Sequence, residues 1–414
     1  MRMLDAVIIG AGAAGIGAAR RLADLGLRYE LLEAKPRVGG RALTDNATFG
    51  VPVDLGCHWL HSPASNPLKT IADSLGIRYL QQDYATRVAR AGLWLDAGES
   101  RDYAQHIDAC FERIADVGRY GVDRAAAEFI GDAGPWGAAF EAAFTAKQGS
   151  PTSMGSTLDY ARYVWEDDDL PVVGGLGNVI AALARGLRVH CGMPVAQVDS
   201  TRADRVRVLT AAGAVEARAV IVTVSTAVLA NAIRFLPELP DWKRAAVADL
   251  PMGSCNKLAL GFTRPVFGDV RDCLVLPLRD ASEVVEIVVG SDGQDVAVCL
   301  VSGDFGRDLA SAGVDAMSTY ALERLCELFG ESLRSAVRPE RIIADWDGDP
   351  FVRGYVAAAR PGCASARETL RRDIDSRIYF AGEATHPTFM GDVHGAWLSG
   401  IDAADSLARV LGNG

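Results

Sequence analysis

Near its N-terminus the chain reads Leu4-Asp5-Ala6-Val7-Ile8-Ile9-Gly10-Ala11-Gly12-Ala13-Ala14-Gly15, an apolar run of strand length that leads directly into a G-x-G-x-x-G motif. A helical pattern follows, and a second apolar strand pattern then ends on the acidic residue Glu33. A strand, spaced glycines, a helix, a strand and an acid in this order are typical of the βαβ unit that binds a dinucleotide. Glycine is common in this chain (43 of 414 residues), so the order of these elements, and not the glycines alone, predicts a dinucleotide site.

Each part of the motif has a physical role in such a site. Gly10 lets the chain turn sharply out of the strand, Gly12 lets the backbone approach a pyrophosphate, and Gly15 lets the helix pack closely on the strand. The N-terminus of the helix supplies oriented N–H groups for the phosphates. Glu33 stands at the end of the second strand, where a carboxylate accepts the hydroxyl groups of the adenosine ribose.

A glycine pair and an arginine follow the ribose acid, in the order Glu33-Ala34-Lys35-Pro36-Arg37-Val38-Gly39-Gly40-Arg41. Gly39 and Gly40 allow a second close approach of the backbone to the cofactor, and Arg41 is placed to pair with pyrophosphate oxygens. The alternative for this stretch alone is a glycine turn beside a solvated arginine.

The composition indicates a globular protein of two domains. At 414 residues the chain is too long for one simple core, and 49% of its residues are hydrophobic. We expect no transmembrane helix, because no apolar run is long enough to cross a bilayer. Since the first strand begins at Leu4, we also expect no signal peptide.

Charge and cysteine content limit the classes of partner and compartment. The formal net charge of −11 disfavours nucleic acid and anionic membranes and is compatible with a cationic substrate, although acidity also serves solubility. The eight cysteines are scattered without a C-x-x-C pair. This pattern favours reduced thiols in the cytoplasm over a disulfide framework or a metal site.

A second signature lies near the C-terminus, where a strand pattern ends in Ala381-Gly382-Glu383 and Val393-His394-Gly395-Ala396 begins a helix. Together with the N-terminal motif, it resembles the flavin-containing amine oxidase family, and the stretch 54–77 resembles the polyamine oxidases. The resemblance implies FAD in place of NAD, with Gly382, Glu383 and Val393 at the cofactor.

The resemblance also implies which residues lie at the reacting end of the cofactor. Met252-Gly253-Ser254-Cys255-Asn256-Lys257 matches the family's M-G-x-x-N-K pattern, in which the lysine holds a water against the flavin N5 atom. Lys257 is therefore the expected catalytic residue, and an ordinary surface lysine is the alternative. Trp59 is expected on the cofactor side and His61 on the substrate side, against the alternative of a packed aromatic and a hydrogen-bonded histidine in a loop.

Further residues are assigned by the same resemblance. The cofactor side includes Val195, near the adenine, and Trp346, in the family's W-x-x-D-P segment. Some members attach FAD through a cysteine in that segment, but here the place holds Gly354 or Tyr355, so noncovalent FAD is expected. Trp397 is assigned to the substrate side.

This sequence departs from the aromatic pair that often encloses the amine in the family. Either Tyr355 or Val356 fills the first position, depending on the alignment, and Asp392 stands at the second. We interpret Asp392 either as the N-cap of the final helix or as a carboxylate that holds a substrate ammonium. The residues predicted to bind the substrate are His61, Tyr355, Asp392 and Trp397.

The predicted fold is α/β, with a Rossmann-like FAD-binding domain of the glutathione-reductase-related (GR2) type and an interleaved α+β substrate domain. The FAD-binding domain is expected to comprise residues 1–79, 170–229 and 345–414, and the substrate domain residues 80–169 and 230–344. Residues 80–169 show alanine-rich helical patterns, including 124–130, with little strand signal. We interpret the acidic run at 165–169 as a solvated loop.

The expected activity is FAD-dependent oxidation of a C–N bond in a primary or secondary, polyamine-like amine to an imine, with O₂ as acceptor and release of H₂O₂. The alternatives are a flavin-dependent desaturase, an L-amino-acid oxidase in which Arg353 binds the substrate carboxylate, and a flavin-binding regulatory protein without turnover. We expect a cytoplasmic monomer or homodimer that needs no metal and binds neither nucleic acid nor membranes. The identity of the amine stays open.

Overall fold

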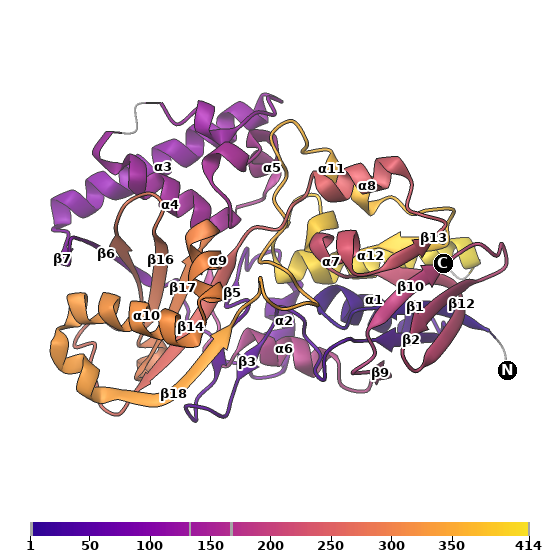
Figure 1. Cartoon of the computed structure of the whole chain (residues 1–414), viewed down its shortest axis with the longest axis horizontal. Coiled ribbons are helices and arrows are strands. Elements are labelled where there is room, and N and C mark those ends of the chain that lie inside the picture. The colour runs from indigo at the N-terminus through magenta and orange to yellow at the C-terminus, as the bar shows by residue number, and fades with distance from the viewer. Residues whose placement is uncertain (1–2, 132–133, 166–168, 413–414) are drawn as a thin grey trace.

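The computed structural model describes residues 3–131, 134–165 and 169–412. It contains two large β-sheets, which lie toward opposite ends of the molecule (Figure 1). Two short strand pairs, β3 (Thr44–Asp45) with β4 (Val53–Asp54) and β5 (Trp59–Leu60) with β8 (Leu170–Pro171), lie outside the large sheets. This arrangement confirms the predicted α/β class.

The first sheet has the topology of a dinucleotide-binding fold. Its order is β13-β10-β11-β12-β1-β2-β9, and β19 pairs with β12. The strands that run parallel to their neighbours around β1 are β1 (Leu4–Ile9), β2 (Tyr29–Leu32), β9 (Val189–His190), β12 (Gly213–Val222) and β19 (Ile378–Phe380). The remaining strands are β10 (Val195–Asp199), β11 (Val206–Thr210) and β13 (Arg234–Leu236).

The strand β1 is buried on both faces, which explains its continuous apolar sequence. Val7 and Ile9 belong to one core, and Ala6 and Ile8 belong to a second core that the helices α1 (Ala13–Asp24) and α12 (Val393–Leu411) complete. The predicted order of strand, glycine loop, helix and strand is confirmed.

The second sheet is mostly antiparallel, with the order β18-β14-β17-β16-β15-β6-β7. Its strands are β6 (Ala85–Arg90), β7 (Leu93–Trp94), β14 (Cys255–Phe262), β15 (Cys273–Leu278), β16 (Val284–Val289), β17 (Val296–Ser302) and β18 (Val337–Ala344). Helix α10 (Val314–Phe329) packs on one face of this sheet, through a core that includes Leu258, Ile287 and Met317. The other face turns toward the first sheet and toward α4 (Gly137–Gln148).

The other helices surround these sheets. The α-helices are α2 (Pro67–Ser74), α3 (Ala97–Arg119), α5 (Thr157–Arg162), α6 (Leu176–Leu183), α7 (Thr226–Asn231), α8 (Asp241–Ala248), α9 (Gly303–Ser311) and α11 (Ala366–Arg371). The 3₁₀ turns are η1 (Ala126–Glu128), η2 (Gly134–Trp136), η3 (Thr152–Met154), η4 (Ser291–Gly293), η5 (Glu331–Ala336) and η6 (Glu383–Thr385). None of the helices in the described ranges combines the length and apolar character needed to cross a bilayer.

Two details of the segment 80–169 differ from the prediction. Residues 85–94 form β6 and β7 at the edge of the second sheet, because pairing with β15 orders a sequence of weak strand propensity. The predicted helix over 124–130 is reduced to the turn η1. The predicted domain boundaries stay a proposal, and the pairing of β13 with β10 argues for placing 234–236 with the FAD-binding part.

Helices α1 and α12, from the two ends of the chain, are in backbone contact. A Cβ atom on Gly400 would lie 1.9 Å from the carbonyl oxygen of Ala14, and one on Gly17 would lie 2.5 Å from that of Trp397. Any side chain at either glycine would therefore push the helices apart.

A buried ion pair joins helix α5 to helix α11. Arg367, in α11, donates to both carboxylate oxygens of Asp159, in α5, at 2.6 and 2.8 Å. Two further N–H groups of Arg367 donate to the carbonyls of Ala357 and Ala384, and Asp159 accepts a further bond from the amide of Ala359. Each nitrogen of the guanidinium and each oxygen of the carboxylate thus has at least one hydrogen-bond partner, although the side chains are only 2% and 6% exposed.

We predict that Asp159→Asn lowers the free energy of unfolding by about 3–5 kcal/mol, because it leaves the buried guanidinium of Arg367 without a counter-charge. Chemical denaturation of the FAD-loaded protein measures this loss. Asp402→Asn is the control, because its partner Arg371 lies at 2.9 Å in an exposed pair, for which about 1 kcal/mol or less is expected. Equal losses for the two variants would contradict the structural role of the buried pair.

Candidate cofactor and substrate site

A cavity of about 680 Å³ is lined by residues of both large sheets. It begins at the carboxyl ends of β1 and β2, where parallel sheets bind ligands, and reaches β14 and β17 of the second sheet. The sequence-predicted residues that line it are Gly10, Gly12, Glu33, Gly39, Gly40, Arg41, Trp59, His61, Val195, Lys257, Trp346, Tyr355, Gly382, Glu383, Asp392 and Val393. The volume lies within the range of about 300–1,000 Å³ typical of ligand pockets.

The glycines around the end of β1 and the start of α1 have different structural roles. Gly10 has a φ of +100°, and a Cβ on Gly15 would lie 1.8 Å from the carbonyl oxygen of Gly10. Gly15 therefore permits the turn and the helix packing without lining the cavity. Gly12 meets Gly39 across a short bridge, and the amide of Gly39 donates to the carbonyl of Ala11 at 2.8 Å.

The polar groups at this end fit the dinucleotide that the sequence predicts. Helix α1 begins at Gly12 without a side-chain cap, and α12 begins at Asp392 without one. Because Ala13 and Val393 in the two first turns line the cavity, two helix N-termini present uncapped N–H groups and positive dipole ends to it. Such ends bind phosphate and other anionic groups. Glu33 accepts from the amides of Ala11 at 2.7 Å and Lys35 at 2.8 Å, so the acid predicted to bind the ribose also holds the glycine loop.

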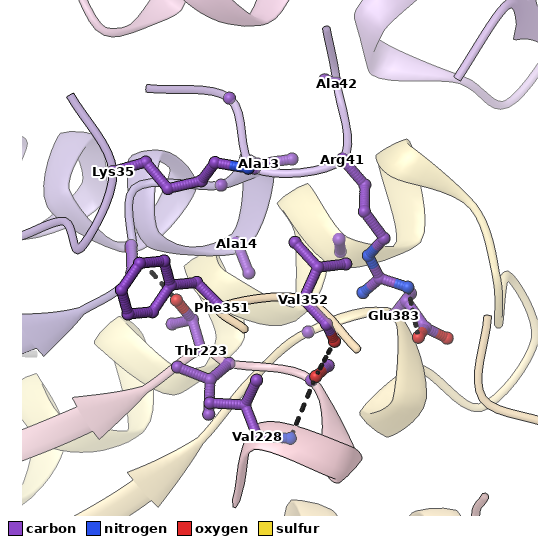
Figure 2. Close-up of a pocket in the computed structure, with 18 of the residues that line it drawn as sticks. Ala13, Ala14, Lys35, Arg41, Ala42, Thr223, Val228, Phe351, Val352 and Glu383 are labelled. Carbon is purple, nitrogen blue, oxygen red and sulfur yellow. Dashed lines mark hydrogen bonds and ion pairs between the residues drawn. The ribbon is translucent and has the colours of Figure 1, made fainter. Parts of the chain in front are cut away.

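Arg41 and Glu383 lie next to each other in the cavity wall, and their side chains point toward one another (Figure 2). The Arg41 guanidinium donates to Glu383 at 3.1 Å and to the carbonyl of Tyr355. Glu383 also accepts from the amides of Ala357 and Gly391 at 3.1 and 3.2 Å. Arg41 thus has protein partners in place of the phosphates expected from the sequence, and its pairing with pyrophosphate stays a prediction.

The segment 346–352 closes one side of the cavity, with Phe351 and Val352 in its wall (Figure 2). An ion pair between Lys35 and Asp349 joins this segment to the loop after β2. The hydroxyl of Ser225 donates to the carbonyl of Val352 at 2.6 Å. The sequence pattern carried no signal for these contacts, because they join segments far apart in the chain.

Lys257 extends from β14 to the cavity wall. Its ammonium donates to the carbonyl of Gly56 at 2.6 Å and lies 6.0 Å from the centre of the Trp59 ring. The side chain is buried, and burial lowers the pKa of Lys257 against the opposing effects of Cys255 and Asp54. The surface-lysine alternative is therefore wrong.

The asparagine of the M-G-x-x-N-K motif positions Lys257. Asn256 accepts from the amide of Trp346 at 2.8 Å and donates to Asp347 at 2.8 Å. The indole N–H of Trp346 in turn donates to the carbonyl of Leu55 at 3.1 Å, beside Gly56. These bonds explain why the M-G-x-x-N-K motif and the W-x-x-D-P segment occur together although they are distant in sequence. Sequence reasoning did not predict this role of Asn256.

His61 lines the cavity and forms an ion pair with Asp169, with 2.8 Å between Nδ1 and Oδ2. Burial alone would lower the pKa of His61, but the charges of Asp392 and Asp169 raise it. Burial would raise the pKa of Asp169, but its bond to His61 holds it below the ordinary value. The solvated-loop prediction is wrong for Asp169, and 166–168 lie outside the described residues.

Asp392 stands at the N-cap position of α12, but its carboxylate accepts no bond from the helix. It accepts the hydroxyl of Tyr163 at 2.5 Å and lines the cavity. Burial raises the pKa of Asp392, although His61 and Tyr163 oppose this effect. The capping alternative is therefore wrong, and the structure brings Asp392 and His61 together at one end of the cavity.

Both candidates for the aromatic position line the cavity, but on different sides. Tyr355 packs with the second-sheet core that contains Leu300, whereas Val356 lies beside Gly391. Trp397 does not line the cavity, contrary to the expectation from the resemblance. It packs in a core with residues of α1, α2 and α6, since it is turned about 100° around α12 from the cavity-lining Ala396.

Solved structures with this fold include two amine oxidases. Cyclohexylamine oxidase from Brevibacterium oxydans IH-35A has a TM-score of 0.82 and 20% identity, over 99% of this chain and 100% of that one. A putrescine oxidase variant with redesigned cofactor binding has a TM-score of 0.81 and 20% identity, over 98% of this chain and 99% of that one. These likenesses confirm the predicted fold.

Sequence comparison identifies the family. Polyamine oxidase 4 of Oryza sativa subsp. japonica is 29% identical over 440 aligned residues, which cover 97% of this chain and 88% of the relative. The family model described as flavin containing amine oxidoreductase matches residues 13–94 and 109–408, which is most of the chain. The chain therefore belongs to the flavin containing amine oxidoreductases, as its motifs predicted, and is an FAD-dependent amine oxidase.

Proposed function

We propose that this enzyme oxidises the C–N bond of a primary or secondary amine that carries a second positive charge, as diamines and polyamines do. The observation that supports this proposal is the continuity of one cavity from the glycine loop, past Lys257, to His61 and Asp392. The first part fits a dinucleotide, and the last part presents acidic groups to a cation. Amine and O₂ would give an imine and H₂O₂, and water would hydrolyse the imine to an aldehyde or ketone with release of ammonia or a smaller amine.

When bound, FAD supplies the acceptor for the hydride equivalent that leaves the amine's α-carbon. The chain's own residues position the amine and exclude water. The charge of Asp392, beside the hydrogen-bonded His61–Asp169 pair, attracts the ammonium groups of the substrate, whereas the reacting nitrogen must lose its proton before it is oxidised. Lys257 presents a buried, preorganised N–H donor at the opposite part of the wall.

The arrangement disfavours the alternative of an amino-acid oxidase. Arg353, the residue expected to bind a substrate carboxylate, is exposed and does not line the cavity. The acidic groups Asp169 and Asp392 would also repel a carboxylate at the substrate end. A regulatory protein without turnover would have no use for the buried Lys257.

Location and assembly stay predictions. A cytoplasmic location is supported by the cysteines, all eight of which are free thiols, as expected in a reducing compartment. A monomer or homodimer is proposed without a finding that tests it.

We predict that FAD is held without a covalent bond. Gly354 and Tyr355 occupy the place of the attachment cysteine. Burial raises the pKa of both thiols that line the cavity, Cys57 and Cys255, the latter to about 11, so neither is a ready nucleophile. Acid precipitation should release yellow flavin into the supernatant, whereas flavin that stays in the protein pellet would show a covalent bond.

We predict that Lys257→Met retains FAD but slows flavin reduction, reoxidation or both by about 10²-fold or more, since loss of one preorganised donor at a reacting centre commonly has this effect. Stopped-flow absorbance near 450 nm measures both half-reactions. Lys69→Met, at a partly exposed position in α2 that does not line the cavity, is the control. Wild-type rates in both half-reactions would return Lys257 to a structural role.

We predict that Asp392→Asn lowers kcat/KM for diamines more than for monoamines. Asparagine keeps the shape of the side chain but removes the charge that holds an ammonium, an effect on the order of 2–5 kcal/mol, or roughly 30-fold and above. Peroxide release from matched diamines and alkylamines measures it, with Asp402→Asn in the same helix as the control. An equal loss for both classes would show that Asp392 does not select a second charge.

A further inference from the structure

Strand register places three side chains in one row across the second sheet. Lys257 of β14 pairs with Leu300 of β17, and Leu300 pairs with Glu286 of β16. Directly paired residues project from the same face of a sheet, so the three side chains stand side by side. Lys257 and Leu300 line the cavity, and Glu286 lies one strand beyond them.

The surrounding residues confirm which face this is. Leu300 and Val288 belong to the core on the cavity side of the sheet, whereas Ile287 belongs to the core beneath α10. Since side chains alternate along a strand, Glu286 projects to the cavity side with Val288. Helix α4 packs over this part of β16, so the carboxylate lies between the sheet and the helical segment.

The side chain of Glu286 has no hydrogen bond or ion pair with any described residue, although it is partly buried. The charges that act on it are Lys147, in α4, and Lys257. The Lys147 ammonium does not bind the carboxylate and instead lies 4.5 Å from the centre of the Trp165 ring. Burial raises the pKa of Glu286, as expected for a carboxylate that lacks a bonded cation.

We infer that Glu286 binds the distal ammonium of a diamine or polyamine substrate, whose methylene chain crosses Leu300 from the reacting amine beside Lys257. This inference rests on the proposed function and assigns its specificity to a particular residue. Glu286 is a specificity-determining residue in this scheme and takes no part in bond breaking.

The row matches such a substrate in both spacing and chemistry. Two inter-strand steps separate Lys257 from Glu286 by about 9.5 Å between Cα atoms. The apolar Leu300 lies between them, as the methylenes lie between two nitrogens. Tyr355 lines the cavity, and burial together with the charges of Glu286 and Asp392 raises the pKa of its hydroxyl, so an aromatic ring able to contact a cation lies within electrostatic range of both carboxylates.

Glu286→Gln tests the inference in the FAD-loaded enzyme. The ratio of kcat/KM for 1,7-diaminoheptane to that for heptylamine should fall about tenfold or more, since a charged hydrogen bond to the second ammonium is lost. Lys147→Gln should raise the same ratio, because it removes a cation that competes with the distal ammonium. Glu340→Gln, an exposed position on β18 of the same sheet, is the matched control and should leave the ratio unchanged.

A thermal-shift titration with 1,7-diaminoheptane reports binding independently of turnover and should show weaker stabilisation of Glu286→Gln than of wild type. An unchanged ratio with an unchanged titration would overturn the assignment of Glu286 while leaving amine oxidation intact. If wild type releases no peroxide with any amine, the proposed function fails, and the titration still decides whether Glu286 binds a diammonium. If Glu286→Gln does not fold, the opposite sign expected for Lys147→Gln carries the test.

Discussion

The backbone contact between α1 and α12 is the constraint on which the cofactor site depends. Gly17 and Gly400 let the helices approach until the backbone of each meets the other, so the two ends of the chain form one wall. Both helices begin at that wall without side-chain caps, and their positive ends point into the cavity. A methyl group on either glycine would push the two helices apart and separate their N-termini, because a packed interior has no space to absorb the change.

Buried polar side chains then fix the distant segments against this wall. Asn256 joins β14 to the segment that begins at Trp346, and Glu383 joins Arg41 to the backbone at Ala357 and Gly391. A buried polar group without partners is costly, so each of these bonds stabilises one arrangement of its segments over others. The family's scattered motifs are therefore parts of one hydrogen-bonded frame around the cavity.

The proposed substrate end of the cavity differs from this frame in its electrostatic character. Two hydrogen-bonded pairs lie here, His61 with Asp169 and Tyr163 with Asp392. One residue of each pair, His61 and Asp392, lines the cavity. Their surroundings are largely protein, where charges interact more strongly than in water. Acidic groups held in this way favour a cation and select against an anion. This charge pattern is the basis of the proposal that the site accepts amines in preference to amino acids.

The sequence by itself determined what depends on local order: the β1-glycine-α1-β2 unit, the acid Glu33, and the motif that contains Lys257. Each of these features lies within a short stretch of sequence, so it can be recognised without knowing which distant segments pack against it. Tertiary structure alone decided which face each residue presents. Asp392 sits at a cap position yet bonds to Tyr163, Asp169 pairs with His61, and Trp397 turns into the core. Likewise, residues 85–94 became strands because β15 pairs with them, and Glu286 reached the cavity side through register with Leu300. Each outcome depends on a partner far away in the chain, which no local pattern encodes.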